Sequence, residues 1–282
     1  MKKASLRFFS PAKLNLFFQV LHKRKDGYHE IASIYQAVDL GDFLVFTASS
    51  SLQITTTSPT IPTGENNLAY RAVELFRKHH PATPYFHIHI EKNIPQEAGL
   101  GGASSNAATT LWALNRWMDR PFSTEELQKM AVHLGADVPF FFSSGFAYCT
   151  GIGEKVVSLK ATCGSKLDFV ADLYKPKSSL STPKVYGEMH RFTCSKTPFS
   201  PQDFLAKPVY TNDLEKAACF LAPDLIEYKK RLFLKGYKTV SMSGSGTCYF
   251  CLGKGDTSTF PKPLQTVFGI TRKKNQWYSQ NS

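Results

Sequence analysis

Apolar and polar residues alternate near the start of the chain, in the run AKLNLFFQV at residues 12–20. A strand with this pattern would turn its apolar side chains to one face and would place Lys13 and Asn15 side by side on the other. The following turn, HKRKDGYHE, contains an Asp-Gly pair that is typical of a β-hairpin, and a second extended run returns at residues 31–40. The chain is therefore predicted to begin with two antiparallel strands.

Extended and helical patterns follow one another through the rest of the chain, which predicts an α+β fold. In the first half we expect strands at 43–47, 52–56 and 85–91, and helices at 68–80, 103–117 and 123–135. In the second half we expect a strand at 167–174, two helices within 213–236 broken by a proline, and two strands around a glycine turn at 237–253. Proline, serine and lysine become more frequent after about residue 150, so we predict two domains, at residues 1–152 and 153–282.

Composition narrows the class of protein but not its partner. With 282 residues, of which 42% are hydrophobic and 20% charged, the chain is typical of a globular protein. Its net charge of +12 would suit a nucleic acid or a phosphorylated small molecule equally well. Charged residues and a proline interrupt the signal-peptide-like start, no segment reaches the ~18 apolar residues of a membrane span, and the irregularly spaced cysteines are typical of reduced thiols. We therefore expect a cytoplasmic protein that does not bind membranes.

A glycine-rich loop, IPQEAGLGGASS at residues 94–105, leads directly into a predicted helix. Such a loop offers backbone N–H groups and the positive end of a helix dipole, which suits a phosphate. Ser104 and Ser105 add hydroxyls that could meet phosphate oxygens or a magnesium ion. The loop lacks the GK[ST] ending of a P-loop, so that mononucleotide fold is disfavoured. Glycine and alanine before a helix could also serve only close packing.

Two further features gain meaning when they are taken together with this loop. A second glycine turn, SMSGSGT at residues 241–247, is weak alone, but paired with the first it suggests two turns that meet over one ligand. Asp137 lies in the apolar stretch LGADVPFFF and must be hydrogen-bonded or paired, because burying a lone charge is costly. It could be only a cap or a structural ion pair. If Lys13 reaches it, the two could orient a hydroxyl and move its proton.

These residues resemble the GHMP kinases. The resemblance is carried by SPAKLNLFFQVLHKRKDGYHEIASIYQAVDLGD at 10–42, by IPQEAGLGGASSNAATTLWALN at 94–115 with LGADVPFFF at 134–142, and by SMSGSG at 241–246. It implies a two-domain fold, with an N-terminal ribosomal-protein-S5-like domain and a C-terminal ferredoxin-like domain. The blocks PAKLNL and DGYHE resemble the family members that use ATP to phosphorylate the 2-hydroxyl of 4-diphosphocytidyl-2-C-methyl-D-erythritol, in the non-mevalonate route to isoprenoids.

The resemblance also implies roles for individual residues. Asp137 would draw the proton from the substrate hydroxyl, and Lys13 would hold charge beside it. ATP would be contacted near adenine by Asn67 and Lys92, and magnesium is expected with it, on ligands that the sequence does not identify. The triphosphate would be wrapped by Pro95, Gln96, Glu97, Ala98, Gly99, Leu100, Gly101, Gly102, Ala103, Ser104 and Ser105, with the second glycine turn at Gly244, Ser245 and Gly246.

The substrate residues that the resemblance implies lie in three other places. Tyr28 and His29 would recognise cytosine by stacking and by hydrogen bonds, with Tyr186 on the opposite side of the base. Asn15 would help to hold the methylerythritol end, and Thr182 would lie near the sugar alcohol. The implied partner is thus a small molecule, the cytidine diphosphate conjugate of methylerythritol, and not a nucleic acid. Neither the residues nor the resemblance predicts the oligomeric state.

One departure from the family pattern lies in the phosphate loop, where Glu97, Ala98 and Ala103 replace part of a glycine-dense run. A carboxylate at Glu97 would repel a triphosphate unless it points away or meets a metal, and fewer residues are free to adopt positive φ. Two alternatives stay open: another GHMP kinase, acting on homoserine or mevalonate, and a basic nucleic-acid-binding protein. The pairs His87–His89 and Cys248–Cys251 are interpreted as a polar strand face and a buried core, not as metal sites.

Overall fold

The computed structural model describes residues 5–159, 169–195 and 197–279. Its first sheet has the order β3-β4-β2-β5-β6, with β1 pairing with β2 off this path. The strands are β1 (Leu6–Lys23), β2 (His29–Ser49), β3 (Gln53–Thr56), β4 (Tyr85–Glu91), β5 (Phe146–Gly151) and β6 (Lys155–Ser158). A second sheet, of order β10-β7-β9-β8, contains β7 (Val170–Tyr174), β8 (Thr239–Met242), β9 (Tyr249–Leu252) and β10 (Gln265–Phe268).

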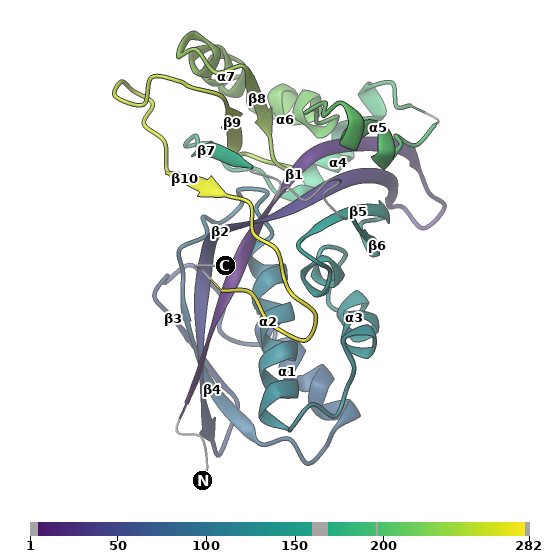
Figure 1. Ribbon diagram of the computed structural model, residues 1–282, viewed down its shortest axis with the longest axis vertical. Coiled ribbons are helices and arrows are strands. Elements are labelled where there is room, and N and C mark those ends of the chain that lie inside the picture. Colours follow the sequence, from purple (N-terminus) through teal and green to yellow (C-terminus); the bar gives the residue numbers. More distant parts are fainter. Residues whose placement is uncertain (1–4, 160–168, 196, 280–282) are drawn as a thin grey trace.

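Helices accompany both sheets, which confirms the predicted α+β class. Those near the first sheet are α1 (Leu68–His79), α2 (Gly102–Trp117) and α3 (Thr124–Val132), followed by a short 3-10 helix at Val138–Phe142 (Figure 1). Those near the second are α4 (Thr182–Gly187), a 3-10 helix at Glu188–Arg191, α5 (Pro201–Ala206), α6 (Leu214–Leu221) and α7 (Asp224–Leu234). In the described part of the chain, no helix is long and apolar enough to cross a membrane.

The long hairpin of β1 and β2 links the two halves of the molecule. Its lower part packs with α2, whereas its tip reaches the region of α4 and α6 (Figure 1). There Phe18 exchanges backbone hydrogen bonds with the second half: its N–H donates to the carbonyl of Thr211 at 2.8 Å, and its carbonyl accepts from Asp213 N–H at 2.9 Å. The predicted domain boundary at 152 and 153 stays a prediction; β6, just beyond it, still pairs with β5.

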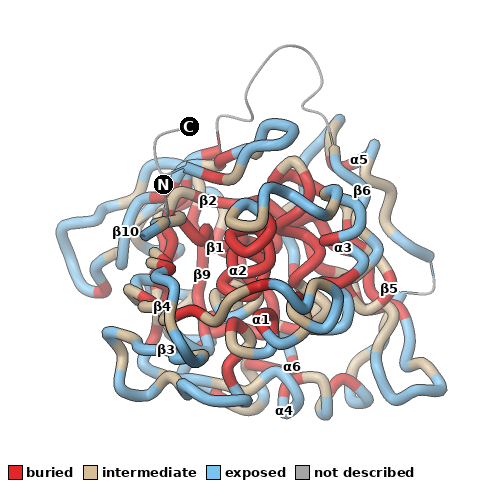
Figure 2. Tube along the Cα trace, turned by 90° about the horizontal axis from the view of Figure 1, so that it is seen from below, coloured by how far each residue is buried: buried red, intermediate tan, exposed pale blue. Residues whose placement is uncertain are grey.

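The main core lies where α1 and α2 cover the first sheet. All residues of α2 from Ser105 to Asn115 are buried, so this helix runs through the centre of the molecule (Figure 2). The small and apolar residues of this segment allow the helix to be buried on all sides. The start of α2, which carries the glycine loop, is thereby held rigidly against the sheet.

Several predicted elements have different bounds in the structure, and two of the differences have a clear local cause. The expected separate strand at 43–47 is wrong, because β2 continues from His29 to Ser49. At Gly41 the pairing of β2 with β1 shifts in register, from Pro11↔Gly41 to Ala12↔Val38. The strand therefore bends there without ending. Helix α3 begins after Ser123, whose side chain and that of Glu126 form the capping box, but it ends at Val132, before the expected Gly135.

Candidate active site

A single cavity of about 1370 Å³ collects most of the residues that the sequence singled out. It is bordered by both glycine turns, by the tip of the β1–β2 hairpin and by α4. The predicted residues that line it are Lys13, Tyr28, His29, Asn67, Lys92, Pro95, Gln96, Glu97, Ala98, Gly99, Leu100, Gly101, Gly102, Ala103, Ser104, Asp137, Thr182, Tyr186, Gly244, Ser245 and Gly246. Asn15 and Ser105 are buried and do not line it.

The glycine loop presents the start of α2 to this cavity. Gly99 and Gly101 have φ of 72° and 69°, in the left-handed region, and Gly101 is the N-cap of α2. The first hydrogen bond of the helix runs from Ser105 N–H to the Gly101 carbonyl at 2.8 Å. The amides of residues 102–104 precede it, and together with the helix dipole they form a site suited to an anion. Ala103 is already helical, a conformation that any L-residue adopts.

The two glycine turns are in direct contact. The amides of Thr247 and Cys248 donate to the carbonyls of Glu97 and Ala98, at 3.2 and 3.1 Å. A Cβ added at Gly99 would lie 1.9 Å from the Ser243 carbonyl oxygen, so only glycine permits this approach. Ser243 was not assigned a role from the sequence, although its position within the second glycine turn, directly before Gly244, was a usable signal.

Lys13 and Asp137 form an ion pair at the floor of the cavity. The Lys13 ammonium lies 3.3 Å from Asp137 Oδ2, and it also donates to Asn15 Oδ1 at 2.5 Å. The Lys13 side chain is almost fully buried at 4% exposure, whereas Asp137 is 29% exposed. Tyr35, on β2, donates from its hydroxyl to Asp137 Oδ1 at 3.0 Å. The carboxylate is therefore oriented by two donors while one side faces the cavity, as a general base requires.

Asn15, which is buried and does not line the cavity, links the Lys13–Asp137 pair to neighbouring elements. Its Nδ2 donates to Ser33 Oγ at 3.2 Å, and its backbone N–H donates to Ser243 Oγ at 3.2 Å. Ser243 Oγ in turn donates to the Gly99 carbonyl at 3.0 Å. These contacts join Ser243 to Asn15, within β1, and to Gly99 of the first glycine loop.

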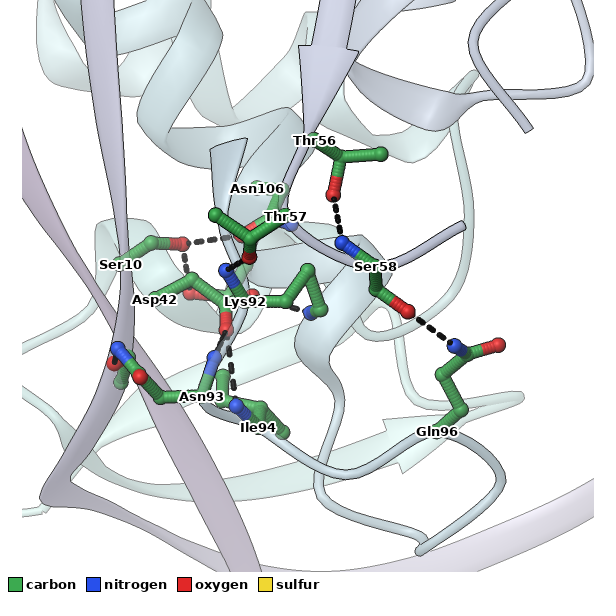
Figure 3. A network of polar contacts seen from close by, with 12 residues as sticks. Ser10, Asp42, Thr56, Thr57, Ser58, Lys92, Asn93, Ile94, Gln96 and Asn106 are labelled. Carbon is green, nitrogen blue, oxygen red and sulfur yellow. Dashed lines mark hydrogen bonds and ion pairs between the residues drawn. The ribbon is translucent and has the colours of Figure 1, made fainter. Parts of the chain in front are cut away.

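A second ion pair lies at the other end of the glycine loop. The Lys92 ammonium contacts Asp42 Oδ2, and Asp42 Oδ1 accepts from the amides of Asn93 and Ile94 at 2.8 and 2.9 Å (Figure 3). Asp42 is fully buried. The predicted Ser105 lies beside this network, 2.8 Å from Ser10 Oγ. The only sequence signal for this ion pair was Asp42 itself, an aspartate without an assigned role at the end of the run VDLGD.

Glu97 and Asn67 have defined surroundings at the cavity edge. Glu97 is exposed, adopts a φ of 48°, and its charge tends to raise the pKa of Lys175, although burial lowers that pKa overall. The Glu97 carboxylate thus has a cation nearby. Asn67 is the N-cap of α1: its side chain accepts from Ala69 N–H at 2.8 Å and donates to the Pro62 carbonyl at 2.7 Å.

Aromatic side chains gather at the hairpin end of the cavity. Tyr28 is 60% exposed, and the rings of His29 and Tyr186 lie 5.3 Å apart. Burial, followed by the charges of Lys23 and His22, lowers the pKa of His29 below its ordinary value, so the imidazole is neutral at pH 7. Burial and the nearby Asp137 charge raise the pKa of Tyr186. Neutral rings at this end are suited to stacking on a planar base.

Thr182, at the start of α4, connects this aromatic end to the second glycine turn. Its Oγ1 lies 2.8 Å from Ser245 Oγ. The turn itself is held by Asn212, whose Nδ2 donates to the carbonyls of Met242 and Gly244 at 2.8 and 2.7 Å. Among the described residues, no cluster of three or more histidine, cysteine or acidic side chains could hold a metal. His87 and His89 instead flank Thr55 Oγ1, each at 2.8 Å.

Comparison with known proteins agrees with this geometry. Residues 67–145 match the GHMP kinases N terminal domain family. The 4-diphosphocytidyl-2-C-methyl-D-erythritol kinase of Protochlamydia amoebophila (strain UWE25) is 43% identical, over 98% of this chain and 93% of its own. The chain belongs to the GHMP kinase family. Another relative of this GHMP kinase is the chloroplastic/chromoplastic enzyme of the same name from Solanum lycopersicum, 38% identical over 97% of this chain and 73% of its own.

Solved structures place this GHMP kinase among proteins of the same fold. A crystal structure of 4-(cytidine 5'-diphospho)-2C-methyl-D-erythritol kinase has a TM-score of 0.72 and 35% identity, covering 89% of this chain and 91% of that one. The homoserine kinase of Cytophaga hutchinsonii has a TM-score of 0.67 at 19% identity, covering 91% and 87%. At that identity the likeness shows the fold alone. The predicted GHMP kinase fold is confirmed, and its members use ATP on small molecules.

Proposed function

We propose that this GHMP kinase transfers the terminal phosphate of ATP to the 2-hydroxyl of 4-diphosphocytidyl-2-C-methyl-D-erythritol. The observation that carries the proposal is one continuous cavity, which joins an anion site at the start of α2, the Lys13–Asp137 pair and an aromatic end around His29. These three parts match the triphosphate, the acceptor hydroxyl and the cytosine of the two substrates.

The anion site would hold the triphosphate. Phosphoryl transfer needs alignment and charge neutralisation more than covalent chemistry from the protein. The amides of residues 102–104 and the α2 dipole provide fixed positive ends that need no rearrangement when charge develops. Magnesium would supply further positive charge with the nucleotide. The half-buried Ser104, which lines the cavity, has a hydroxyl of the kind this hard cation accepts, and the phosphates would provide most other ligands.

Asp137 would receive the proton of the substrate hydroxyl. Lys13, 3.3 Å from its Oδ2, stabilises the ionised carboxylate and adds positive charge beside the transferred group. A positioned general base contributes about 10²–10⁴-fold to the rate. Asn15, which does not line the cavity, would act by holding the Lys13 ammonium, with which it shares a hydrogen bond of 2.5 Å.

The aromatic end would select the cytosine. Tyr28, His29 and Tyr186 line the cavity together, and a neutral His29 can both stack and exchange hydrogen bonds with a base edge. Thr182, bonded to Ser245, would lie along the sugar alcohol between this end and Asp137. Homoserine and mevalonate have no planar base, so this region argues against them as substrates.

A substrate comparison tests the proposal. Steady-state phosphorylation should be measured with ATP and, in turn, the cytidine diphosphate conjugate, homoserine and mevalonate. We expect turnover with the conjugate alone; turnover with only one of the other two would contradict the proposal.

Filter binding of nucleic acid over a range of salt concentrations tests the alternative of a basic nucleic-acid-binding protein. Tight, steeply salt-dependent binding without kinase activity would favour that alternative. The expected cytoplasmic location stays a prediction.

A further inference from the structure

Tyr35 contacts both members of the Lys13–Asp137 pair. Its hydroxyl donates to Asp137 Oδ1 at 3.0 Å, and the Lys13 ammonium lies 4.7 Å from the centre of its ring. The side chain is 1% exposed and packs edge-on against Phe140, with ring centres 5.2 Å apart. Tyr35 comes from the middle of β2, opposite Asn15 on β1 and Ala147 on β5. Its position is therefore fixed by two strand pairings and by the segment that follows Asp137.

We propose that Tyr35 is a positioning residue for this reaction: its hydroxyl holds Asp137 Oδ1, so that the carboxylate keeps one orientation toward the substrate hydroxyl. The inference rests on the proposed function of Asp137 as the base. Neither the GHMP motifs nor the sequence pattern pointed to this tyrosine.

The hydroxyl of Tyr35 is a permanent donor. Burial, followed by the charge of Asp137, raises its pKa well above the ordinary value, so it keeps its proton throughout the working range of an enzyme. The hydrogen bond that it donates fixes the rotation of the carboxylate, because Lys13 holds Oδ2 and Tyr35 holds Oδ1. Loss of either donor leaves the base free to turn about its side-chain bond.

The groups that face Asp137 come from four elements. They are Lys13 on β1, Tyr35 on β2, Cys149 on β5 and Tyr186 on α4. Lys13 is the only cation of the four. Burial, then the Asp137 charge, raises the pKa of Cys149 and of Tyr186, so both are neutral at pH 7 and change little near the titration of a carboxyl. Removing the Tyr35 hydroxyl therefore isolates one hydrogen bond in an otherwise unchanged environment.

The first test needs no substrate. Crystal structures of the wild type and of Tyr35→Phe should be compared at the Asp137 side chain. We expect one carboxylate orientation in the wild type and a turned or disordered carboxylate in Tyr35→Phe, because one of its two donors is lost. Tyr148→Phe is the matched control. It removes the same atom on neighbouring β5, where the hydroxyl donates to the Phe199 carbonyl at 2.9 Å, and it should leave the Asp137 carboxylate unchanged.

The second test uses the kinase assay. Tyr35→Phe should lower kcat roughly tenfold, within the range of base assistance, while KM for ATP changes little. In an Asp137→Asn background the same change should have almost no further effect. An Asp137 carboxylate that keeps its orientation in Tyr35→Phe, or an equal rate loss in the Asp137→Asn background, would overturn the proposal. If the wild type does not phosphorylate the conjugate, the proposed function fails, but the crystal structures still decide whether Tyr35 holds the carboxylate.

Discussion

Two of the lysines that line the cavity, Lys13 and Lys92, each form an ion pair with an aspartate, and the two pairs differ in what surrounds the carboxylate. Asp42, the partner of Lys92, is fully buried and accepts from two backbone amides as well as from the ammonium. Asp137, the partner of Lys13, is 29% exposed and lines the cavity. A saturated carboxylate can only hold structure, whereas one with a free side can accept a proton. The same two residue types thus form a buried structural pair at one end of the glycine loop and, as we propose, a reactive pair at the other.

The comparison predicts its largest effect for Asp137→Asn. This change keeps the shape of the side chain and removes its basicity, so we expect kcat to fall about 10²–10⁴-fold while ATP affinity stays nearly the same. Steady-state kinetics and ATP titration calorimetry measure the two quantities. Glu97→Gln is the matched control, because it removes a negative charge from the same cavity without removing a base. Near-normal turnover of Asp137→Asn would eliminate it as the base.

The same change in the other ion pair, Asp42→Asn, should lower the free energy of unfolding. Removing one partner of a buried ion pair leaves an uncompensated charge, here on Lys92, and costs about 3–5 kcal/mol. Urea unfolding should show this loss, and Asp137→Asn should show far less. If the two variants were equally stable, the structural role that we assign to Asp42 would be wrong.

The hairpin and glycine patterns made much of this arrangement predictable. The neighbourhood of Lys13 and Asn15 follows from strand alternation, and the contact of the two glycine turns was expected from their shared chemistry. Asp42 and Tyr35 were missed, because their partners are distant in sequence and are fixed by strand register, which one sequence does not reveal. The burial of Ser105 was missed for a similar reason: this residue of α2 contacts Ser10 of β1, which is distant in sequence.

A third change tests the join between the two glycine turns, on which the reactive pair depends. Gly99→Ala would combine a φ of 72° with a Cβ 1.9 Å from the Ser243 carbonyl oxygen. Gly27→Ala has a similar φ of 88° and nothing within 4 Å, so it measures the backbone strain alone. We expect roughly 1–2 kcal/mol of destabilisation for Gly27→Ala and clearly more for Gly99→Ala. Equal thermal shifts would mean that the two turns do not need their close approach.

The smallest effect is expected at His29, whose pKa is lowered by burial and then by Lys23 and His22, whereas Lys13 and Lys92 are each paired with a carboxylate. Its NMR titration midpoint should lie below the ordinary value of 6.5, because burial, Lys23 and His22 disfavour the charged ring. Lys23→Met should raise the midpoint and Lys25→Met should not. As pH falls below 6.5, the unfolded chain takes up this proton before the folded one, so stability decreases through that window. A midpoint at or above 6.5 would contradict the proposal that a neutral His29 recognises the cytosine.

The central claim is that residues 102–104 hold a triphosphate whose terminal group faces Asp137 and Lys13. A crystal structure with a nonhydrolysable ATP analogue and the cytidine diphosphate conjugate tests it most directly. The account predicts phosphate oxygens within hydrogen-bond distance of those amides and the substrate 2-hydroxyl beside the Asp137 carboxylate. Phosphates bound elsewhere, or a hydroxyl out of reach of Asp137, would contradict it.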